Sequence, residues 1–173
     1  FFTYCIYIYI SKYILYIILM NINASDDIFY RYKMPILDIN QYGKGNGKFT
    51  NLVNITDVCN AINTPLKILM VYLTQSLGTN YKETSLNGHY NKDNLIDLII
   101  KFNKEFILCQ KCNIPELTPS IEGKKKNIRL IYSCSACGEN YEKKTNGKIN
   151  DKTVDAIINY YKVNEFIKTN GNV

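Results

Sequence analysis

Cys109-Gln-Lys-Cys112 and Cys134-Ser-Ala-Cys137 are two matched cysteine pairs, and 21 residues lie between them. Two thiolates spaced in this way bind one ion, and a second pair completes the tetrahedral sulfur shell that Zn²⁺ prefers. Four unliganded thiols, or two disulfides in a secreted protein, are the alternatives. Neither explains two short matched spacings, each near a turn-forming residue, Pro115 or Gly138. The spacing therefore predicts a structural zinc ribbon over residues 107–142.

The rest of the composition narrows the class of protein. The chain has 173 residues, which suits one ordinary domain or two small ones with a shared core. The ribbon alone is too short to bury a sufficient core, so its folding should depend on the metal, worth about 10 to 16 kcal/mol in zinc-finger peptides. A net charge of +6 is compatible with phosphate contacts but is weak evidence for them.

The remaining cysteines and the single histidine exclude several functions. Cys5 and Cys59 show no disulfide spacing, so a thiolate metal site favours a reducing compartment, the cytosol or the nucleus. His89 is the only histidine, and no paired carboxylates are identifiable. We therefore expect no active site of the protein's own.

Residues 1–19 differ from the rest, because they are almost all Ile, Tyr, Phe and Leu with Lys12 in the middle. A signal peptide would place its charge first and end at a small-residue cleavage site. We interpret the segment as translated upstream sequence, with Met20 as the natural start. A membrane anchor is the alternative, although it would have to bury Lys12.

Residues 20–34 are expected to form a mobile tail that ends in an aromatic and basic cluster. Arg31 lies between Tyr30 and Tyr32, with Phe29 before them and Lys33 after. These aromatic side chains can anchor the segment against a partner and fix the guanidinium, which an ordinary solvated tail would not do.

Residues 35–106 are expected to form a small α/β domain. Strand-like segments at 36–39 and 49–55 flank a glycine-rich hairpin loop that presents Lys44 and Lys48. Helices are expected at 57–62, capped by Thr56, and from Thr64-Pro65 to Gly78. A short strand at 79–86 and an amphipathic helix at 93–106 follow.

The C-terminal part continues the ribbon and adds a helix. Lys124, Lys125 and Lys126 occupy a turn that either contacts RNA phosphate or simply solubilises the ribbon. Residues 143–173 are expected to form a linker and an amphipathic helix that packs back or continues into a missing part. The predicted fold class is thus α+β, with a small α/β domain, a four-cysteine zinc ribbon and an extended N-terminal tail.

Several of these segments together resemble a known family. They are residues 29–35, the glycine loop 43–47, residues 53–58 with Asn63 and Pro65, Asn87-Gly88, residues 104–109 and residues 135–138. In this order, over roughly residues 23–140, the sequence resembles the N-terminal domain of eukaryotic translation initiation factor 5. The beta subunit of translation initiation factor 2 shares the fold and the ribbon, but lacks the aromatic and arginine motif.

The resemblance implies a GTPase-activating protein that acts on initiation factor 2 in the small-subunit preinitiation complex, close to initiator tRNA. The family's essential arginine falls on Arg31, which would act in trans as an arginine finger. Partners would be the gamma and beta subunits of factor 2 and the small ribosomal subunit. Residues expected to contact partners or RNA are Tyr30, Tyr32, Lys33, Lys44, Asn46, Lys124, Lys125 and Lys126.

The sequence departs from the family at two assisting lysines. Lys48 lies one place early, with Phe49 at the expected position, so Lys48 is only a candidate assisting cation, and Val71 occupies the helical position. The leading hypothesis is GTPase activation through Arg31. A non-catalytic binding module of the factor 2 beta type and a generic zinc-ribbon RNA binder are the alternatives.

Overall fold

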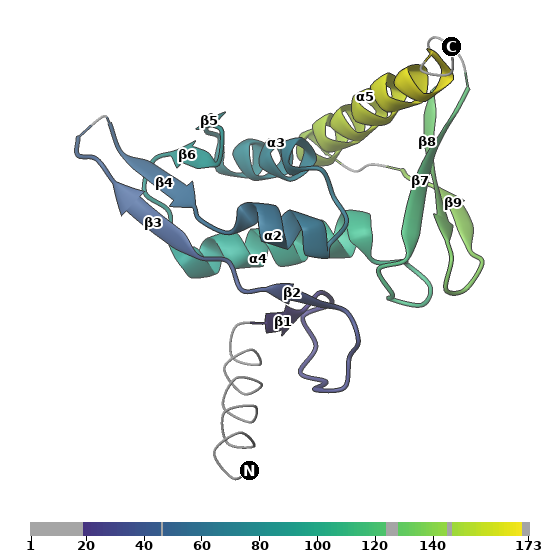
Figure 1. Ribbon diagram of the computed structural model, residues 1–173, viewed down its shortest axis with the longest axis horizontal. Coiled ribbons are helices and arrows are strands. Elements are labelled where there is room, and N and C mark those ends of the chain that lie inside the picture. Colours follow the sequence, from purple (N-terminus) through teal and green to yellow (C-terminus); the bar gives the residue numbers. More distant parts are fainter. Residues whose placement is uncertain (1–18, 46, 124–127, 145–146, 171–173) are drawn as a thin grey trace, which may run out of the picture.

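The structure, a computed structural model, describes residues 19–45, 47–123, 128–144 and 147–170, and its side chains up to Val163. Predictions on residues 1–18 therefore lie outside the described residues. The fold is α+β, as predicted. Figure 1 shows a layer of helices with a small sheet at one end and the cysteine-bearing ribbon at the other.

An antiparallel four-stranded sheet, in the order β3-β4-β6-β5, forms one end of the α/β domain. Its strands are β3 (Ile39–Tyr42), β4 (Phe49–Leu52), β5 (Tyr81–Lys82) and β6 (Ser85–Asn87). The glycine-rich segment joins β3 to β4 as the predicted hairpin loop. Gly43 has φ +84°, and an added Cβ would lie 1.8 Å from the Gly47 carbonyl oxygen, so the turn requires glycine.

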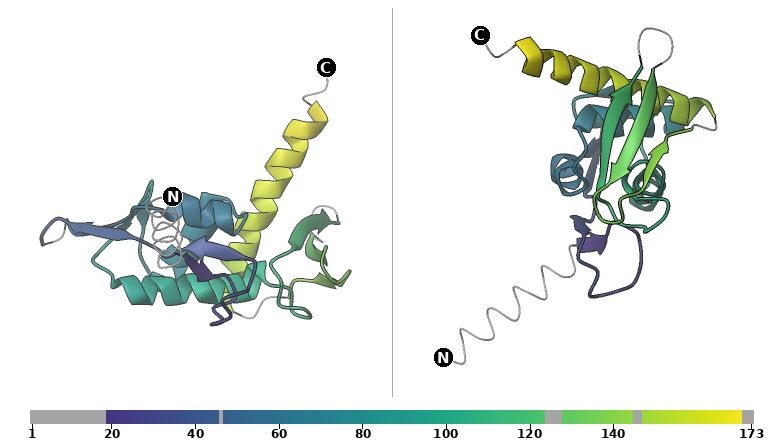
Figure 2. Two further views of the ribbon diagram at one scale, coloured as in Figure 1. Left: turned by 60° about the horizontal axis from the view of Figure 1, so that its bottom comes forward. Right: turned by 90° about the vertical axis from the view of Figure 1, so that its right-hand side faces the viewer.

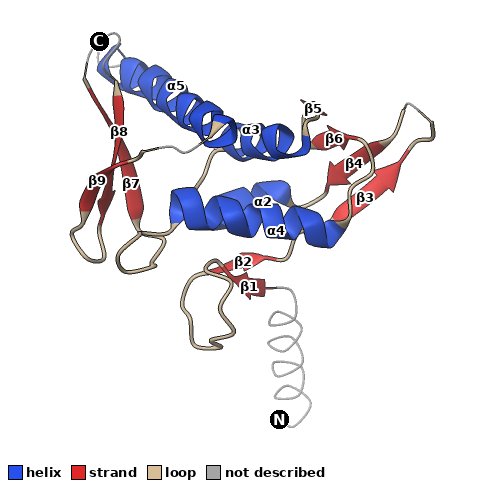
Figure 3. Ribbon diagram, turned by 180° about the vertical axis from the view of Figure 1, so that it is seen from behind, coloured by secondary structure: helices blue, strands red, loops and turns tan. Residues whose placement is uncertain are grey.

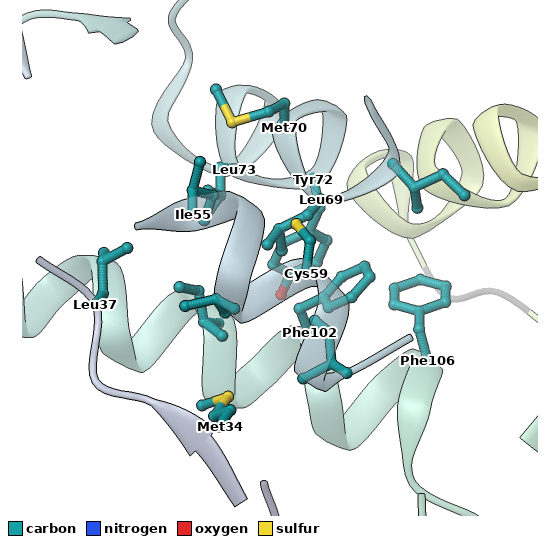
Figure 4. Packing of buried hydrophobic residues seen from close by; sticks show 14 of the residues in the cluster. Met34, Leu37, Ile55, Cys59, Leu69, Met70, Tyr72, Leu73, Phe102 and Phe106 are labelled. Carbon is teal, nitrogen blue, oxygen red and sulfur yellow. The ribbon is translucent and has the colours of Figure 1, made fainter. Parts of the chain in front are cut away.

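Three helices, α2 (Ile55–Ala61), α3 (Leu66–Leu77) and α4 (Lys92–Phe102), enclose the hydrophobic core. Figure 4 shows the buried side chains that converge between them. Tyr72 and Phe102 lie 5.2 Å apart, and Phe102 and Phe106 5.3 Å apart, between ring centroids. The predicted apolar stripe of α4 is therefore core.

Several helix ends differ from the prediction. Thr56 does not cap α2, because Asn54 occupies the cap position, and Asn54 instead accepts a hydrogen bond from the Asp38 N–H (2.7 Å) and donates to the Ile36 carbonyl (2.9 Å). Helix α3 begins after Pro65. The Asn54 side chain thus connects α2 to the segment that precedes β3.

The helix predicted for 93–106 changes type at its end. After α4 comes the π-helix η1 (Asn103–Ile107), where the Leu108 N–H donates to the Asn103 carbonyl at 2.8 Å. The Asn103 side chain is buried and donates to the Ile22 carbonyl at 3.2 Å. The wider turn directs the chain into the first cysteine pair.

The single strand predicted for 79–86 is instead the hairpin of β5 and β6. Glu83, with φ +55°, forms its turn. The segment lacks the Asn-Gly or Asp-Gly pair that would have indicated a tight hairpin turn.

Residues 19–35 differ most from the prediction, because residues 20–34 are not a mobile tail. Strand β1 (Leu19–Asn21) pairs antiparallel with β2 (Lys33–Pro35). Ile22 and Met34 are each 2% exposed and belong to the core. Two well-placed apolar side chains thus hold a segment whose composition is largely polar.

The ribbon is an antiparallel three-stranded sheet of β7 (Leu117–Glu122), β8 (Arg129–Cys134) and β9 (Asn140–Glu142). Helix α5 (Lys148–Asn170) follows it. This helix packs back on α3 and touches β7, as one of the two predicted alternatives stated, and its far end projects from the core (Figure 2). Within the described ranges, no helix has the length and apolar character needed to cross a membrane.

Candidate metal centre and arginine loop

The two cysteine pairs form knuckles with the same backbone hydrogen bonds. In each, the first cysteine N–H donates to the carbonyl five residues later, and its own carbonyl accepts from the N–H four residues later. The four bonds are Cys109 to Ile114 (3.1 Å), Asn113 to Cys109 (2.9 Å), Cys134 to Glu139 (2.8 Å) and Gly138 to Cys134 (2.9 Å).

A left-handed residue closes each knuckle. Gly138 has φ +72° and Asn113 has φ +57°. Glycine and asparagine are the residues that adopt this conformation most readily. The counterpart of Gly138 is therefore Asn113, not Pro115, and a Gly or Asn four residues after the first cysteine is the signal that sequence reasoning missed.

The knuckles bring the four sulfurs together. Sγ of Cys109 lies 3.7 Å from that of Cys137, and Sγ of Cys112 lies 3.6 Å from that of Cys134. All four sulfurs lie within 4.8 Å of one another, and no disulfide joins the described cysteines. A tetrahedron with metal–sulfur bonds of about 2.3 Å has edges of about 3.8 Å. The four cysteines can therefore hold one metal ion.

The same geometry gives the thiols different pKa values. Burial opposes ionisation of Cys109, but backbone N–H groups of Cys112 and Lys111 and the neighbouring thiols lower its pKa to about 7. Burial raises the pKa of Cys112 to about 12. The Glu139 N–H favours the Cys137 thiolate, yet burial and the thiols of Cys134 and Cys109 raise the pKa of Cys137 as well. A metal ion must therefore displace protons, and its affinity should fall in acid.

Residues 22–32, here called the arginine loop, are closed at their base. The Ile22 N–H donates to the Tyr32 carbonyl at 3.1 Å. The Asn21 side chain donates to the carbonyls of Ser25 and Asp27, both at 2.7 Å, and accepts from Lys33 Nζ at 2.7 Å. The loop is thus tied to β1 and β2.

A second attachment joins the arginine loop to the ribbon. The Tyr32 hydroxyl donates to Oε1 of Glu116 at 2.7 Å. The guanidinium carbon of Arg31 lies 5.7 Å from the centroid of the Tyr32 ring, and the Arg31 side chain is exposed. Tyr30 lies 5.8 Å from Tyr32 between centroids. The result is an exposed cation on a loop that is tied to the cysteine-bearing ribbon.

The aromatic residues of the loop differ in burial. Phe29 is 88% exposed, and its N–H donates to the Asp27 carboxylate at 2.9 Å. Tyr30 is half-buried, and burial raises its pKa. Its hydroxyl is buried without a hydrogen-bond partner among the residues that the structure describes. The aromatic residues therefore anchor the loop within the chain as well as facing outward.

The structure separates the other predicted cations from Arg31. Lys44 and Lys48 are exposed at the tip of the β3–β4 hairpin, at the far end of the molecule from the loop between β1 and β2 (Figures 1 and 3). Phe49 stacks on Tyr42 with centroids 5.4 Å apart. Val71 is half-buried on α3, facing a groove against α5. Asn46, Lys124, Lys125 and Lys126 lie outside the described residues.

Two residues of the site had no sequence signal. Glu116 contacts Tyr32 across a separation of 84 residues, which no spacing rule links. Lys143 follows β9, is buried, and donates to both the backbone carbonyl and the carboxylate of Glu105, with Nζ 4.8 Å from the Phe106 ring centroid. Lys143 joins the ribbon to η1.

Comparison with known proteins gives consistent matches. Residues 22–140 match the model of a family described as a domain found in initiation factors 2B and 5. The chain is 38% identical over 138 residues to Eukaryotic translation initiation factor 5 of Drosophila melanogaster, covering 76% of this chain and 29% of that protein. The Mus musculus protein of that name is 38% identical over 126 residues, which cover 69% of this chain and 29% of that protein. Probable eukaryotic translation initiation factor 5-2 of Arabidopsis thaliana is 39% identical over 128 residues, which also cover 69% of this chain and 29% of that protein. The chain thus spans less than a third of the length of these relatives.

Proposed function

Because the chain belongs to the family of domains found in initiation factors 2B and 5, with translation initiation factors among its relatives, we propose that it stimulates GTP hydrolysis by initiation factor 2. It would act in the cytoplasm, within the small-subunit preinitiation complex, against the gamma and beta subunits of factor 2 and near initiator tRNA. The observation that carries this proposal is the exposed Arg31 on a doubly anchored loop.

Arg31 would act as an arginine finger in the GTP site of the gamma subunit. The planar guanidinium offers several N–H donors to the oxygens of the transferring phosphoryl group and neutralises the charge that develops there. Arginine fingers typically increase the rate about 10³- to 10⁵-fold. Because the loop is ordered before binding, less conformational entropy is lost on docking.

We further propose that Cys109, Cys112, Cys134 and Cys137 hold a structural Zn²⁺. Four thiolates with these spacings and sulfur separations suit tetrahedral zinc, and four protein ligands leave no open position for substrate. The metal supplies folding free energy to the ribbon. The chemistry at the GTP site remains the task of Arg31.

Substitution of Arg31 tests the proposal in initiation complexes reconstituted with factor 2, initiator tRNA and small subunits. Arg31→Ala should reduce stimulated GTP hydrolysis about 10³-fold or more, and Arg31→Lys should restore little of it, because an ammonium is a point charge. Arg129→Ala, which removes the other arginine of the chain, is the matched control and should keep full activity. Full stimulation by Arg31→Ala would reject the proposal.

A binding module of the factor 2 beta type is the second candidate. The position of Lys48 favours it, since this cation lies far from the arginine loop, and neither Phe49 nor Val71 supplies a charge. Such a module would form a stable stoichiometric complex with the gamma subunit without ribosomes, and Arg31→Ala would not change hydrolysis. Sedimentation of the two purified proteins distinguishes the candidates.

A further inference from the structure

We propose that Glu116 is a positioning residue for Arg31, and that it holds the arginine in place through the hydroxyl of Tyr32. This inference rests on the proposed function of Arg31 in GTP hydrolysis. It assigns the ribbon a role beyond its own folding, because the ribbon carries the acceptor that fixes the arginine loop.

The hydrogen bond between Tyr32 and Glu116 attaches the loop to the ribbon. Further hydrogen bonds of the loop run to β1, as for Asn21 with Ser25 and Asp27, and to η1, as for Asn103 with the Ile22 carbonyl. The Tyr32 hydroxyl instead reaches the Glu116 carboxylate at 2.7 Å. With its hydroxyl held, the Tyr32 ring cannot swing away, and it lies within cation–π distance of the Arg31 guanidinium, 5.7 Å.

Glu116 is itself fixed between the two cysteine knuckles. Its carbonyl accepts a hydrogen bond at 3.0 Å from the N–H of Ser135, which lies within the second cysteine pair. The following residue, Leu117, begins β7 and pairs with Cys134. Glu116 also lies four residues after Cys112. The backbone that carries its carboxylate is therefore held by the second knuckle and follows closely on the first.

Loss of the clamp should leave the loop folded but its arginine poorly placed. The base of the loop stays closed by the β1–β2 pairing and by Asn21. Arg31 and Tyr32 would then sample other rotamers, and only a fraction of complexes would present the guanidinium correctly. A misplacement of about 1 Å can reduce a catalytic rate about 100-fold. Docking surfaces elsewhere on the domain would be unaffected.

Stimulated GTP hydrolysis at varied concentrations of the protein tests the clamp. Glu116→Ala and Tyr32→Phe should each lower the maximal rate about 10- to 100-fold with little change in the half-saturating concentration. Glu116→Gln keeps an acceptor oxygen and should recover most of the rate. The double variant Tyr32→Phe with Glu116→Ala should be no slower than either single variant. Each substitution removes the same hydrogen bond, so the second has nothing further to remove.

The control is Glu122→Ala, which removes an exposed ribbon carboxylate at the end of β7, 3.8 Å from Arg129, without touching the loop. Metal content and melting temperature are measured for every variant. If Glu116→Ala loses its metal or fails to fold, Tyr32→Phe decides alone, because it leaves the ribbon intact.

The outcomes separate the two levels of inference. Unchanged hydrolysis with Arg31→Ala would reject the proposed function. A large loss with Arg31→Ala, but rates for Tyr32→Phe and Glu116→Ala equal to that of the Glu122→Ala control, would overturn the clamp alone. Multiplicative losses in the double variant would overturn it too, since the residues would then act independently.

Discussion

The α/β domain and the ribbon hold themselves together by different means. In the domain, side chains such as Leu52, Leu69 and Leu86 are fully buried among helices and sheet. Along β7 of the ribbon, residues alternate between half-buried and exposed, and none is buried. The domain can thus rely on apolar burial, whereas the ribbon needs its four cysteines. The proposed finger is attached to both parts, to the domain core through Ile22 and Met34 and to the ribbon through Tyr32.

Removal of the metal should give the largest effect on stability, and it should unfold the ribbon while the α/β domain stays folded. We expect a chelator, or Cys134→Ser, to abolish hydrogen-exchange protection in β7, β8 and β9 and to loosen the arginine loop, because thiolate binding supplies the ribbon's folding free energy. Amides of α3 and α4 should stay protected. Hydrogen exchange with mass spectrometry on the full chain measures both regions at once.

Cys59→Ala is the matched control, since Cys59 is buried in the domain and burial raises the pKa of its thiol to about 12. This variant should retain one metal per chain and lose some stability in the α/β domain only. Equal loss of protection in α3 and in β8 after chelation would show that the two regions form one cooperative unit and would refute the contrast.

Lys143→Met should have an intermediate effect, at the joint between the regions. The Lys143 ammonium donates to the Glu105 backbone carbonyl, so its removal deletes a part-buried hydrogen bond from a charged donor, at a cost of about 1.5 to 3 kcal/mol. Its 2% exposed side chain also contacts the Phe106 ring. Urea denaturation gives the change in free energy of unfolding.

Lys144→Met serves as the control, because Lys144 is the exposed neighbour. Its stability should stay close to that of the unaltered protein. Equal destabilisation by the two substitutions would mean that charge in this segment, rather than the buried contact with η1, joins the ribbon to the domain.

The sequence predicted those features that local chemistry determines. Two cysteine spacings predicted the ribbon, and periodic apolar residues predicted α3, α4 and α5 but not whether α5 packs back. The arginine loop was missed as an ordered element, because its order depends on Ile22 entering the core and on Tyr32 reaching Glu116. Contacts across 84 residues leave no periodic trace in a single sequence. The motif around Arg31 was visible, but its support was not.

Glu139→Gln should have the smallest effect on stability, although the ion pair of Glu139 with Lys111 is shorter than that of Glu105 with Lys143. Lys111 Nζ lies 2.7 Å from the Glu139 carboxylate, against 3.2 Å for Lys143 and Glu105. The Lys111 and Glu139 side chains are 65% and 38% exposed, so water and salt screen their attraction. We expect the melting temperature to change by at most about 2 °C.

The pH dependence of this pair has a definite sign. The hydrogen bond to Glu139, and then its negative charge, raise the pKa of Lys111 above the ordinary lysine value. A group whose pKa is raised on folding stabilises the protein below its unfolded pKa, and the contribution is lost as the pH rises through the folded value. Any difference between the unaltered protein and Glu139→Gln should thus be present at neutral pH and be lost in strongly alkaline solution. If Glu139→Gln lowers stability at pH 7 as much as Lys143→Met does, exposure does not decide how much an ion pair stabilises the ribbon. The contrast between the α/β domain and the ribbon would then rest on the four cysteines alone.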